Sequence, residues 1–362
     1  MKKNKLILLT LTAVTALSLT ACTSTSADST SSAPAPSGTE STSSAAETVS
    51  EETRTQTPET QTPESVTITS LNGNKESVEL EIPYDPQRIA ILDMASLDIL
   101  DSLGLGGRVV GSAGTSLDYL QSYIEDENVA NLGTIKEADM EAVMACEPDV
   151  IFIGGRLSAS YDALSEIAPV IYLSTDAETG IAESVRNNAA TIATLFGLEE
   201  QVEEKMAGFG ERIDALAAVA KGKTAIIGMC TSGSFNVLGD DGRCSIIGRE
   251  IGFENLGNGD VTSTHGNEAS FELIVEMNPD YIFVMDRDAA IGTDGAKLAE
   301  EIMENELVMG TDAYKNGNVV YLAHPAVWYT AEGGIQALDI MLSDLESELS
   351  AESNTQAQTA AE

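Results

Sequence analysis

A sixteen-residue pattern occurs twice in this chain. Residues 141–156 read EAVMACEPDVIFIGGR and residues 272–287 read ELIVEMNPDYIFVMDR, with identical residues at six matched positions. In each copy an apolar run with helical spacing ends at Pro-Asp. A short β-branched and aromatic run follows, which is typical of a buried parallel strand. The repetition therefore predicts an α/β protein built from two similar lobes with parallel sheets.

An arginine stands just past the predicted strand in each copy, at Arg156 and Arg287. Ligands of open α/β sheets bind beyond the carboxyl ends of the strands. A third arginine, Arg243, follows Asp-Asp-Gly at a predicted helix start in the second lobe. Because a guanidinium fork matches planar, oxygen-rich anions, the three arginines predict a shared anion site between the lobes. The alternative, local pairing with carboxylates such as Asp241 or Asp286, stays open.

The N-terminal segment is typical of a secreted lipoprotein. Residues 1–22 combine a basic start, a short apolar run and small residues before Cys22, which predicts a signal peptide rather than a membrane-spanning helix. Leu-Thr-Ala-Cys at 19–22 resembles the bacterial lipobox, which implies that Cys22 is lipidated and anchors the protein to the outer face of a membrane. Ordinary secretion is the alternative. Residues 23–64 are rich in Ser, Thr, Pro and Glu and predict a disordered tether, whose length suits a Gram-positive cell wall.

The remaining chain divides into two predicted lobes. Helix and strand patterns alternate over residues 65–180 and again over residues 222–346. Between them, residues 181–221 carry apolar residues at helical spacing and predict a long connecting helix, which its glycines kink or divide. Two packed helices of one lobe are the alternative for this segment. Residues 347–362 are predicted to be a disordered tail.

The composition excludes one class of partner. The formal net charge is −39, whereas proteins that bind nucleic acid need a basic surface. Only nine arginines occur, so a gathering of them is informative. Repulsion from distant carboxylates is screened over roughly 8 Å at physiological salt. Short contacts inside a cleft can therefore still hold a small anion.

Cysteine and histidine patterns indicate neither a zinc site nor an enzyme. Cys146 is predicted to fill the core, while Cys230 and Cys244 flank a predicted hairpin and could form a disulfide. The only histidines, His265 and His324, are far apart, and no cysteine has zinc-ligand spacing. No nucleophile elbow, zinc-protease motif or phosphate-binding loop is present, so the chain is predicted to be a binding protein. A secreted hydrolase that uses the hydroxyls of residues 231–234, and a purely structural surface protein, remain alternatives.

Five motifs carry a resemblance to a known family. They read GGRLS (154–158), GDDGRCSIIG (239–248), THG (264–266), NPDYIFVMDR (278–287) and YLAHPAVWYTAEGG (321–334). With them, the chain from about 66 to 346 resembles the class III substrate-binding proteins of ABC importers, in which two Rossmann-like lobes are joined by a long backbone helix with the ligand cleft between them. Within that class it is similar to the binders of catecholate siderophores, the petrobactin and enterobactin-fragment group.

The resemblance implies roles for particular residues. Arg156, Arg243 and Arg287 would hold the catecholate oxygens of a ferric siderophore. His265 and Tyr329 would ligate the iron where a tetradentate chelator leaves two positions open. Fe(III) would then be carried as part of the siderophore complex, and no intrinsic cofactor is expected. A haem- or corrinoid-binding protein of the same class is the alternative, with Tyr329 or His265 as the axial ligand of haem.

The same resemblance implies partners at the membrane. The protein would be a lipid-anchored monomer that delivers its ligand to an ABC permease and its ATPase. Docking would use Glu141 and Glu272, the first residues of the two repeat copies. One position departs from the group: His324 stands where an acidic residue is usual, and it could compete with Tyr329 for the iron.

Overall fold

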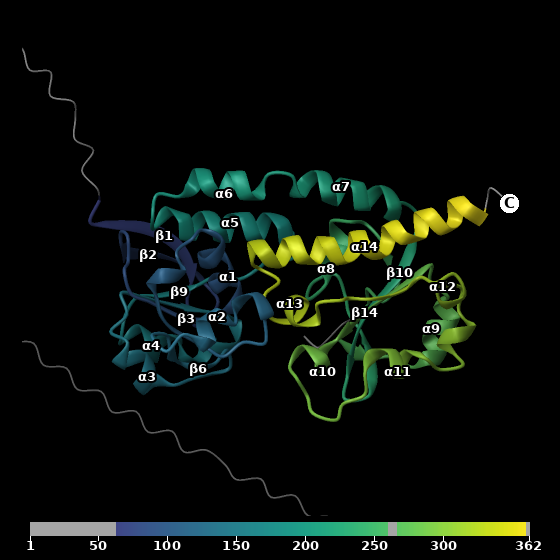
Figure 1. Cartoon of the computed structure of the whole chain (residues 1–362), viewed down its shortest axis with the longest axis horizontal. Helices are drawn as coiled ribbons and strands as arrows, with labels where there is room; N and C mark the ends of the chain where they lie inside the picture. Colours follow the sequence, from purple (N-terminus) through teal and green to yellow (C-terminus); the bar gives the residue numbers. More distant parts are fainter. Residues whose placement is uncertain (1–62, 260–265, 360–362) are drawn as a thin grey trace, which may run out of the picture. The chain divides into compact units, whose positions relative to one another are not determined.

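The computed structural model describes residues 63–259 and 266–359, which form two α/β lobes connected by helices (Figure 1). The predicted α/β fold class is confirmed. The predicted signal peptide, Cys22, nearly all of the predicted tether and His265 lie outside the described residues.

The N-terminal lobe is built around a parallel sheet. Its strands are the hairpin β1 (Ser65–Leu71) and β2 (Ser77–Pro83), the sheet strands β3 (Ile89–Leu92), β4 (Val109–Ser112), β5 (Ala130–Asn131), β8 (Val150–Ile153) and β9 (Val170–Tyr172), and the short pair β6 (Gly133–Thr134) and β7 (Glu137–Ala138). Its helices are α1 (Met94–Ser102), α2 (Ser122–Glu125), α3 (Met140–Ala145) and α4 (Tyr161–Ser165). The order β5-β4-β3-β8-β9 is parallel throughout. Every residue of β3 and β8 is buried, because helices and loops cover both faces of the sheet.

The C-terminal lobe contains a mixed sheet. Its strands are β10 (Thr224–Thr231), β11 (Ser234–Val237), β12 (Glu254–Asn255), β13 (Asn267–Glu268), β14 (Tyr281–Asp286) and β15 (Val319–Tyr321). Its helices are α8 (Ser245–Arg249), α9 (Phe271–Met277), α10 (Arg287–Ala290), α11 (Ala299–Met303), α12 (Asp312–Lys315) and α13 (Pro325–Thr330). The central strands β12, β10, β14 and β15 pair in parallel, whereas β11 and β13 are antiparallel at one edge.

The two repeat copies occupy corresponding places. They form α3 with β8 in the first lobe and α9 with β14 in the second. Each helix begins at a residue whose side chain accepts a backbone N–H of the first turn: Asp139 before α3 and Ser270 before α9. The chain after each strand then emerges at the carboxyl edge of its sheet, with an arginine at Arg156 and Arg287.

The segment between the lobes corrects one expectation. The long helix predicted over residues 181–221 is instead α5 (Ile181–Thr194), α6 (Glu199–Met206) and α7 (Phe209–Ala220). Gly197 and Gly208 adopt φ values of 67° and 90°, in the left-handed region that interrupts a helix. After the first of these glycines the chain folds back, so that α6 packs against α5 (Figure 1).

The last helix, α14, runs from Ile335 to Thr359 and lies against α1, α5 and α7. It extends past residue 347, where the sequence pattern predicted a disordered tail to begin. The physical reason is local: after Leu349 the chain is rich in Ala, Glu and Gln and has no Gly or Pro to stop a helix. In the described part of the chain, no helix combines the length and the apolarity needed to cross a membrane.

A buried carboxylate ties the start of α14 to the N-terminal lobe. Asp98 of α1 accepts the backbone N–H groups of Gln336 and Ala337, each at 2.9 Å, and the hydroxyl of Tyr119 at 2.7 Å. Burial raises the pKa of Asp98 to about 6. Gly334 is required here because a Cβ at that position would overlap the Asp98 carboxyl group. The first turn of α14 is therefore held by a residue of the N-terminal lobe.

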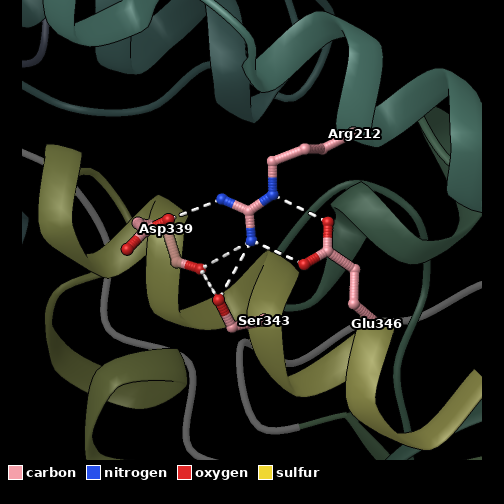
Figure 2. Close-up of polar contacts among 4 residues, drawn as sticks. All are labelled: Arg212, Asp339, Ser343 and Glu346. Carbon is pink, nitrogen blue, oxygen red and sulfur yellow. Dashed lines mark hydrogen bonds and ion pairs between the residues drawn. The ribbon is translucent and has the colours of Figure 1, made fainter. Parts of the chain in front are cut away.

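An arginine clamp joins α7 to α14 (Figure 2). The guanidinium of Arg212 donates to both carboxylate oxygens of Glu346, at 2.7 and 2.9 Å, to the hydroxyl of Ser343 at 3.0 Å and to the carboxylate of Asp339. These three partners lie one above another on a single face of α14, since they are spaced by four and three residues. The hydrogen bonds to Glu346 help to raise the pKa of Arg212, despite the opposing effect of burial.

Replacing Arg212 by Met is expected to lower the free energy of unfolding by about 1 kcal/mol, because the bidentate pair is lost while its partially exposed acids are screened by solvent. The loss should shrink as salt is added. Arg212→Lys is the matched control: it keeps the charge but not the fork, and it should recover only part of the stability. Urea titrations at low and high salt measure both effects. If Arg212→Met lowers the free energy of unfolding by the same amount at high salt as at low salt, then packing rather than charge is responsible.

Candidate functional site

A cavity of about 270 Å³ is lined by residues from both lobes. The N-terminal lobe contributes Gly154, Gly155 and Arg156, directly after β8. The C-terminal lobe contributes Arg243 before α8 and Tyr329 from α13. The cavity thus lies at the carboxyl end of β8, where the sequence pattern predicted a ligand site.

Arg156 approaches Tyr329 from the N-terminal lobe. It lies in the short 3₁₀ segment Gly155–Ser160, and its Nη2 donates to the backbone carbonyl of Tyr329 at 3.4 Å. Its guanidinium carbon is 5.4 Å from the centroid of the Tyr329 ring, within the range of a cation–π contact. Just before it, the chain passes close to Asp93, where a Cβ at Gly154 would overlap the carboxyl group.

Arg243 approaches the same tyrosine from the C-terminal lobe. Its Nε donates to the Tyr329 carbonyl at 3.4 Å, and its guanidinium carbon is 4.4 Å from the ring centroid. The next residue, Cys244, has a φ of 60°, and its backbone N–H donates to Glu332 at 2.8 Å. Burial, reinforced by the positive charge of Arg156, lowers the pKa of Arg243. The exposed Arg156 thus adds a second positive charge beside the half-buried Arg243, and this pair of charges favours an anionic ligand.

Arg287 contacts Tyr329 at its hydroxyl. Its Nε donates to the Tyr329 Oη at 3.2 Å, and its guanidinium carbon is 5.6 Å from the ring centroid. Its Nη1 lies 3.2 Å from the hydroxyl of Thr231 and 3.2 Å from the carboxylate of Asp288. Arg287 is not among the described residues that line the cavity. Local pairing with a carboxylate, the alternative left open by the sequence, therefore applies to this arginine.

Tyr329 is the centre of the group. Tyr329 is 4% exposed and belongs to α13, a helix that the sequence pattern did not predict. Burial acts to raise the pKa of the phenol, but the hydrogen bond from Arg287 and the charges of Arg243, Arg287 and Arg156 outweigh it, so that the pKa is lowered. The structure thus brings four of the predicted site residues together; their contact with a ligand stays a prediction.

Two acids at the cavity were not predicted from the sequence. Asp93 lies at the start of α1 and accepts the backbone N–H and the hydroxyl of Ser96, at 2.9 and 2.8 Å. Burial raises the pKa of Asp93, although the hydrogen bonds from Ser96 oppose it. Burial also raises the pKa of Glu332 to about 7. The spacing Asp-x-x-Ser is a helix-start signal that could have revealed Asp93; nothing local distinguishes Glu332 among so many acids.

The other predicted site residues lie elsewhere. His324 precedes α13 and places its Nδ1 2.7 Å from the Asp344 carboxylate, with a side chain that is 57% exposed. It is not among the described residues that line the cavity. Glu141 and Glu272 are exposed in the first turns of α3 and α9.

The cysteines do not form the disulfide considered from the sequence. Cys230 and Cys244 are both free and buried, and so is Cys146, as expected for a core residue. In the part of the chain that the structure describes, no cluster of three or more His, Cys, Asp or Glu side chains is arranged to hold a metal ion.

Stability is expected to fall as the pH rises from about 4.5 to about 8. The pKa values of Asp98 and Glu332 are raised in the folded state to about 6 and about 7, so the folded protein holds protons that the unfolded chain has released. The stabilisation from these protons is complete below about pH 4, near the pKa values of the two acids in the unfolded chain. It is lost as the pH rises through their pKa values in the folded protein. A loss of roughly 2–3 kcal/mol is expected from Asp98, since one pKa unit corresponds to about 1.4 kcal/mol.

Urea denaturation at constant ionic strength measures this slope. General repulsion within the acidic chain acts in the same direction, so the variants Asp98→Asn and Glu332→Gln separate the two causes. Asp98→Asn should flatten the profile around pH 6, and Glu332→Gln around pH 7. If the free energy of unfolding falls with pH in both variants as steeply as in the wild type, net charge alone causes the pH dependence.

Comparisons with known proteins agree with this architecture. The family described as periplasmic binding protein matches residues 89–326. The chain is 34% identical over 267 residues to the petrobactin-binding protein YclQ of Bacillus subtilis, which covers 73% of this chain and 83% of that protein. The crystal structure of YclQ matches with a TM-score of 0.72 and 32% identity, over 79% of this chain and 99% of the other.

Two further crystal structures are similar. The catecholate-siderophore binding protein VctP of Vibrio cholerae has a TM-score of 0.70 and 30% identity, over 78% of this chain and 100% of the other. The iron uptake ABC transporter substrate-binding protein PiuA of Streptococcus pneumoniae has a TM-score of 0.72 and 30% identity, over 78% and 98%. The resemblance found in the motifs is confirmed, and the chain belongs to the periplasmic binding protein family.

Proposed function

We propose that this protein captures a ferric catecholate siderophore in the cavity between its lobes and delivers it to a membrane ABC permease. The observation that carries the proposal is the meeting of Arg156 and Arg243, from opposite lobes, at one aromatic ring on the cavity wall. A ferric catecholate is anionic, aromatic and rich in oxygen. Guanidinium groups match each of these properties, through charge, stacking and paired N–H donors.

The relatives support the same class of ligand. YclQ is a petrobactin-binding protein, VctP binds catecholate siderophores, and PiuA serves an iron-uptake ABC transporter. Each shares about a third of its residues with this chain. Transfer of their ligand class to this chain is consistent with the two arginines in the cavity lining, in a protein whose net charge is −39.

In this proposal iron is cargo rather than a resident cofactor. Tyr329 is among the lining residues, and a phenolate is a hard anionic donor that suits Fe(III). Together with His265, it would complete the coordination of iron that a tetradentate chelator leaves open. The case for His265 is the resemblance of its THG motif alone.

Membrane attachment and docking belong to the same proposal. Lipidation of Cys22 would hold the protein, a monomer, on the outer face of the cytoplasmic membrane of a Gram-positive cell. Glu141 and Glu272 are exposed on corresponding helices of the two lobes. They would contact the permease, which works with its ATPase. The apolar side chains of Met144 and Leu273, 62% and 39% exposed, lie beside them and suit a protein partner.

Fluorescence titration tests the proposal directly. The only tryptophan, Trp328, is fully buried and is the neighbour of Tyr329 in α13, so a ferric complex in the cavity should quench it. We expect saturable quenching at micromolar ferric catecholate. No quenching by ferric catecholates, together with a Soret shift on addition of haem, would overturn the proposal in favour of haem binding.

A further inference from the structure

Three positively charged side chains surround one aromatic ring. The guanidinium carbons of Arg156, Arg243 and Arg287 lie 5.4, 4.4 and 5.6 Å from the centroid of the Tyr329 ring. All three distances are within the range in which the negative face of a ring attracts a cation. In the described part of the chain, no other aromatic ring has more than one arginine at such a distance. The gathering of cations is therefore a property of this ring in particular.

Cations that are gathered in this way repel one another unless their surroundings compensate. Burial, and next the positive charge of Arg156, lower the pKa of Arg243, so the two guanidinium groups act against each other. Arg287 is paired with the carboxylate of Asp288 at 3.2 Å. Arg156 forms no ion pair with any residue that the structure describes, and its contacts are with the carbonyl and the ring of Tyr329. For this arginine, an aromatic ring takes the place of a carboxylate partner.

The ring itself has little freedom to move. Tyr329 is 4% exposed and belongs to α13, in which the preceding residue, Trp328, is fully buried and donates to Asp344. The helix α13 also packs against α10, which begins at Arg287. The ring is therefore part of the packed interior of the C-terminal lobe, and arginines from both lobes lie against it.

Contacts with Tyr329 leave hydrogen-bond donors for a ligand. Arg156 uses Nη2 for the Tyr329 carbonyl, whereas its Nε and Nη1 have no partner among the described residues. Arg287 uses Nε and Nη1 within the protein, and the structure describes no partner for its Nη2. The N–H bonds of a guanidinium lie in its plane, so an attraction between its face and a ring does not consume them. The ring can thus position cations whose donors still reach an anion.

We infer that Tyr329 is a positioning residue whose ring is a platform: it holds the three guanidinium groups close together before the ligand arrives. The inference rests on the proposed function for its meaning, and the role is separate from any contact of the hydroxyl with iron. Donors that are already in place bind an anion more tightly than mobile ones, because less conformational freedom is lost on binding. The negative face of the ring should therefore contribute to the affinity, although the ring need not touch the ligand.

Fluorination of the ring tests the platform. Tyr329→Phe is the reference, since it removes the hydroxyl and keeps the ring. Replacing Tyr329 by 3,4,5-trifluorophenylalanine keeps a ring of similar shape but draws electrons from its face, so its attraction for cations is mostly lost. The affinity for a ferric tris-catecholate, in which catecholate oxygens fill the iron coordination, should then fall about tenfold below that of Tyr329→Phe. Tyr329→Leu, which has no ring, should fall at least as far.

Nuclear magnetic resonance tests the same point without a ligand. In protein labelled with ¹⁵N-arginine, the Nε–Hε signals of Arg156 and Arg243 are assigned by their loss in the Met variants. They should report restricted side chains in Tyr329→Phe and more mobile ones in the trifluorinated protein and in Tyr329→Leu. The matched control is Phe196→Leu, which removes a ring 5.2 Å from the Arg108 guanidinium carbon, outside the cavity lining. It should shift the Arg108 signal and leave the affinity unchanged.

Three outcomes are decisive. Equal affinities of Tyr329→Phe and the trifluorinated protein, or equally restricted arginines in the two, would overturn the inference. Tighter binding by Tyr329→Leu than by Tyr329→Phe would also overturn it, because the ring would then compete with the ligand for the guanidinium groups. If the wild type does not bind the ferric complex, the proposed function fails, while the mobility of Arg156 and Arg243 in the ligand-free protein still decides whether the ring holds them.

Discussion

Binding of a ferric catecholate should weaken at least a hundredfold when Arg156 and Arg243 are both replaced by Met. Each guanidinium offers charge-assisted hydrogen bonds worth about 1.5–3 kcal/mol, so the pair contributes roughly 3–6 kcal/mol, and every 1.4 kcal/mol is a factor of ten. Methionine keeps much of the side-chain volume. The fluorescence titration described above measures the loss in affinity.

The control for this experiment is Arg186→Met. Arg186 pairs with Glu183 and Glu203 on the surface of the connecting helices, so its loss removes one positive charge, as each single cavity variant does, without touching the cavity. It should leave the affinity nearly unchanged. The affinity of Arg156→Met alone, or of Arg243→Met alone, should lie between the affinity of the wild type and that of the double variant. An unaltered affinity in the double variant would mean that Arg156 and Arg243 do not hold the ligand.

Replacing Trp328 by Ala should reduce the free energy of unfolding by about 3–5 kcal/mol, the usual cost of removing a large aromatic side chain from a core. Trp328 is fully buried, and its indole N–H donates to Asp344 at 2.9 Å. The same carboxylate contacts the ring of His324 at 2.7 Å. The substitution therefore leaves a cavity beneath α13 and removes one of two donors to the Asp344 Oδ2 atom, the other being the backbone N–H of His324 at 3.2 Å.

Trp328→Phe separates these two effects. It retains most of the ring volume and loses only the N–H donor, so its cost should be nearer 1–3 kcal/mol. Urea unfolding followed by far-ultraviolet circular dichroism measures both variants, since each lacks the only tryptophan. Equal losses for Ala and Phe would mean that the hydrogen bond to Asp344, rather than packing, holds α13 in place.

The repeat illustrates what local patterns can predict. Apolar spacing and the Pro-Asp boundary predicted α3 with β8 and α9 with β14, because helix and strand periods are properties of short segments. The same reasoning was only partly right between residues 181 and 221: it predicted helix and a division at glycines, but not that the chain folds back. There the apolar spacing continues across Gly197 and Gly208, and only packing of α6 against α5 selects the left-handed backbone that glycine permits.

The site shows the same division. Arg156, Arg243 and Tyr329 were predicted as site residues, since arginines after strands and the family motifs are visible in the chain itself. The pairing of Arg287 with Asp288, and the acids Asp93 and Glu332 at the cavity, were not predicted. They depend on which elements approach one another in space.

The sequence by itself determined the fold class, the two lobes and the residue types at the strand ends, because these follow from short-range periodicity and composition. Only the tertiary structure decided how Arg156 and Arg243 contact one ring from opposite lobes. It also decided that Arg287 donates a hydrogen bond to Thr231, 56 residues away in the chain. Contacts of this kind arise from long-range packing, in which direction and distance are set by the whole fold. No local pattern contains that information.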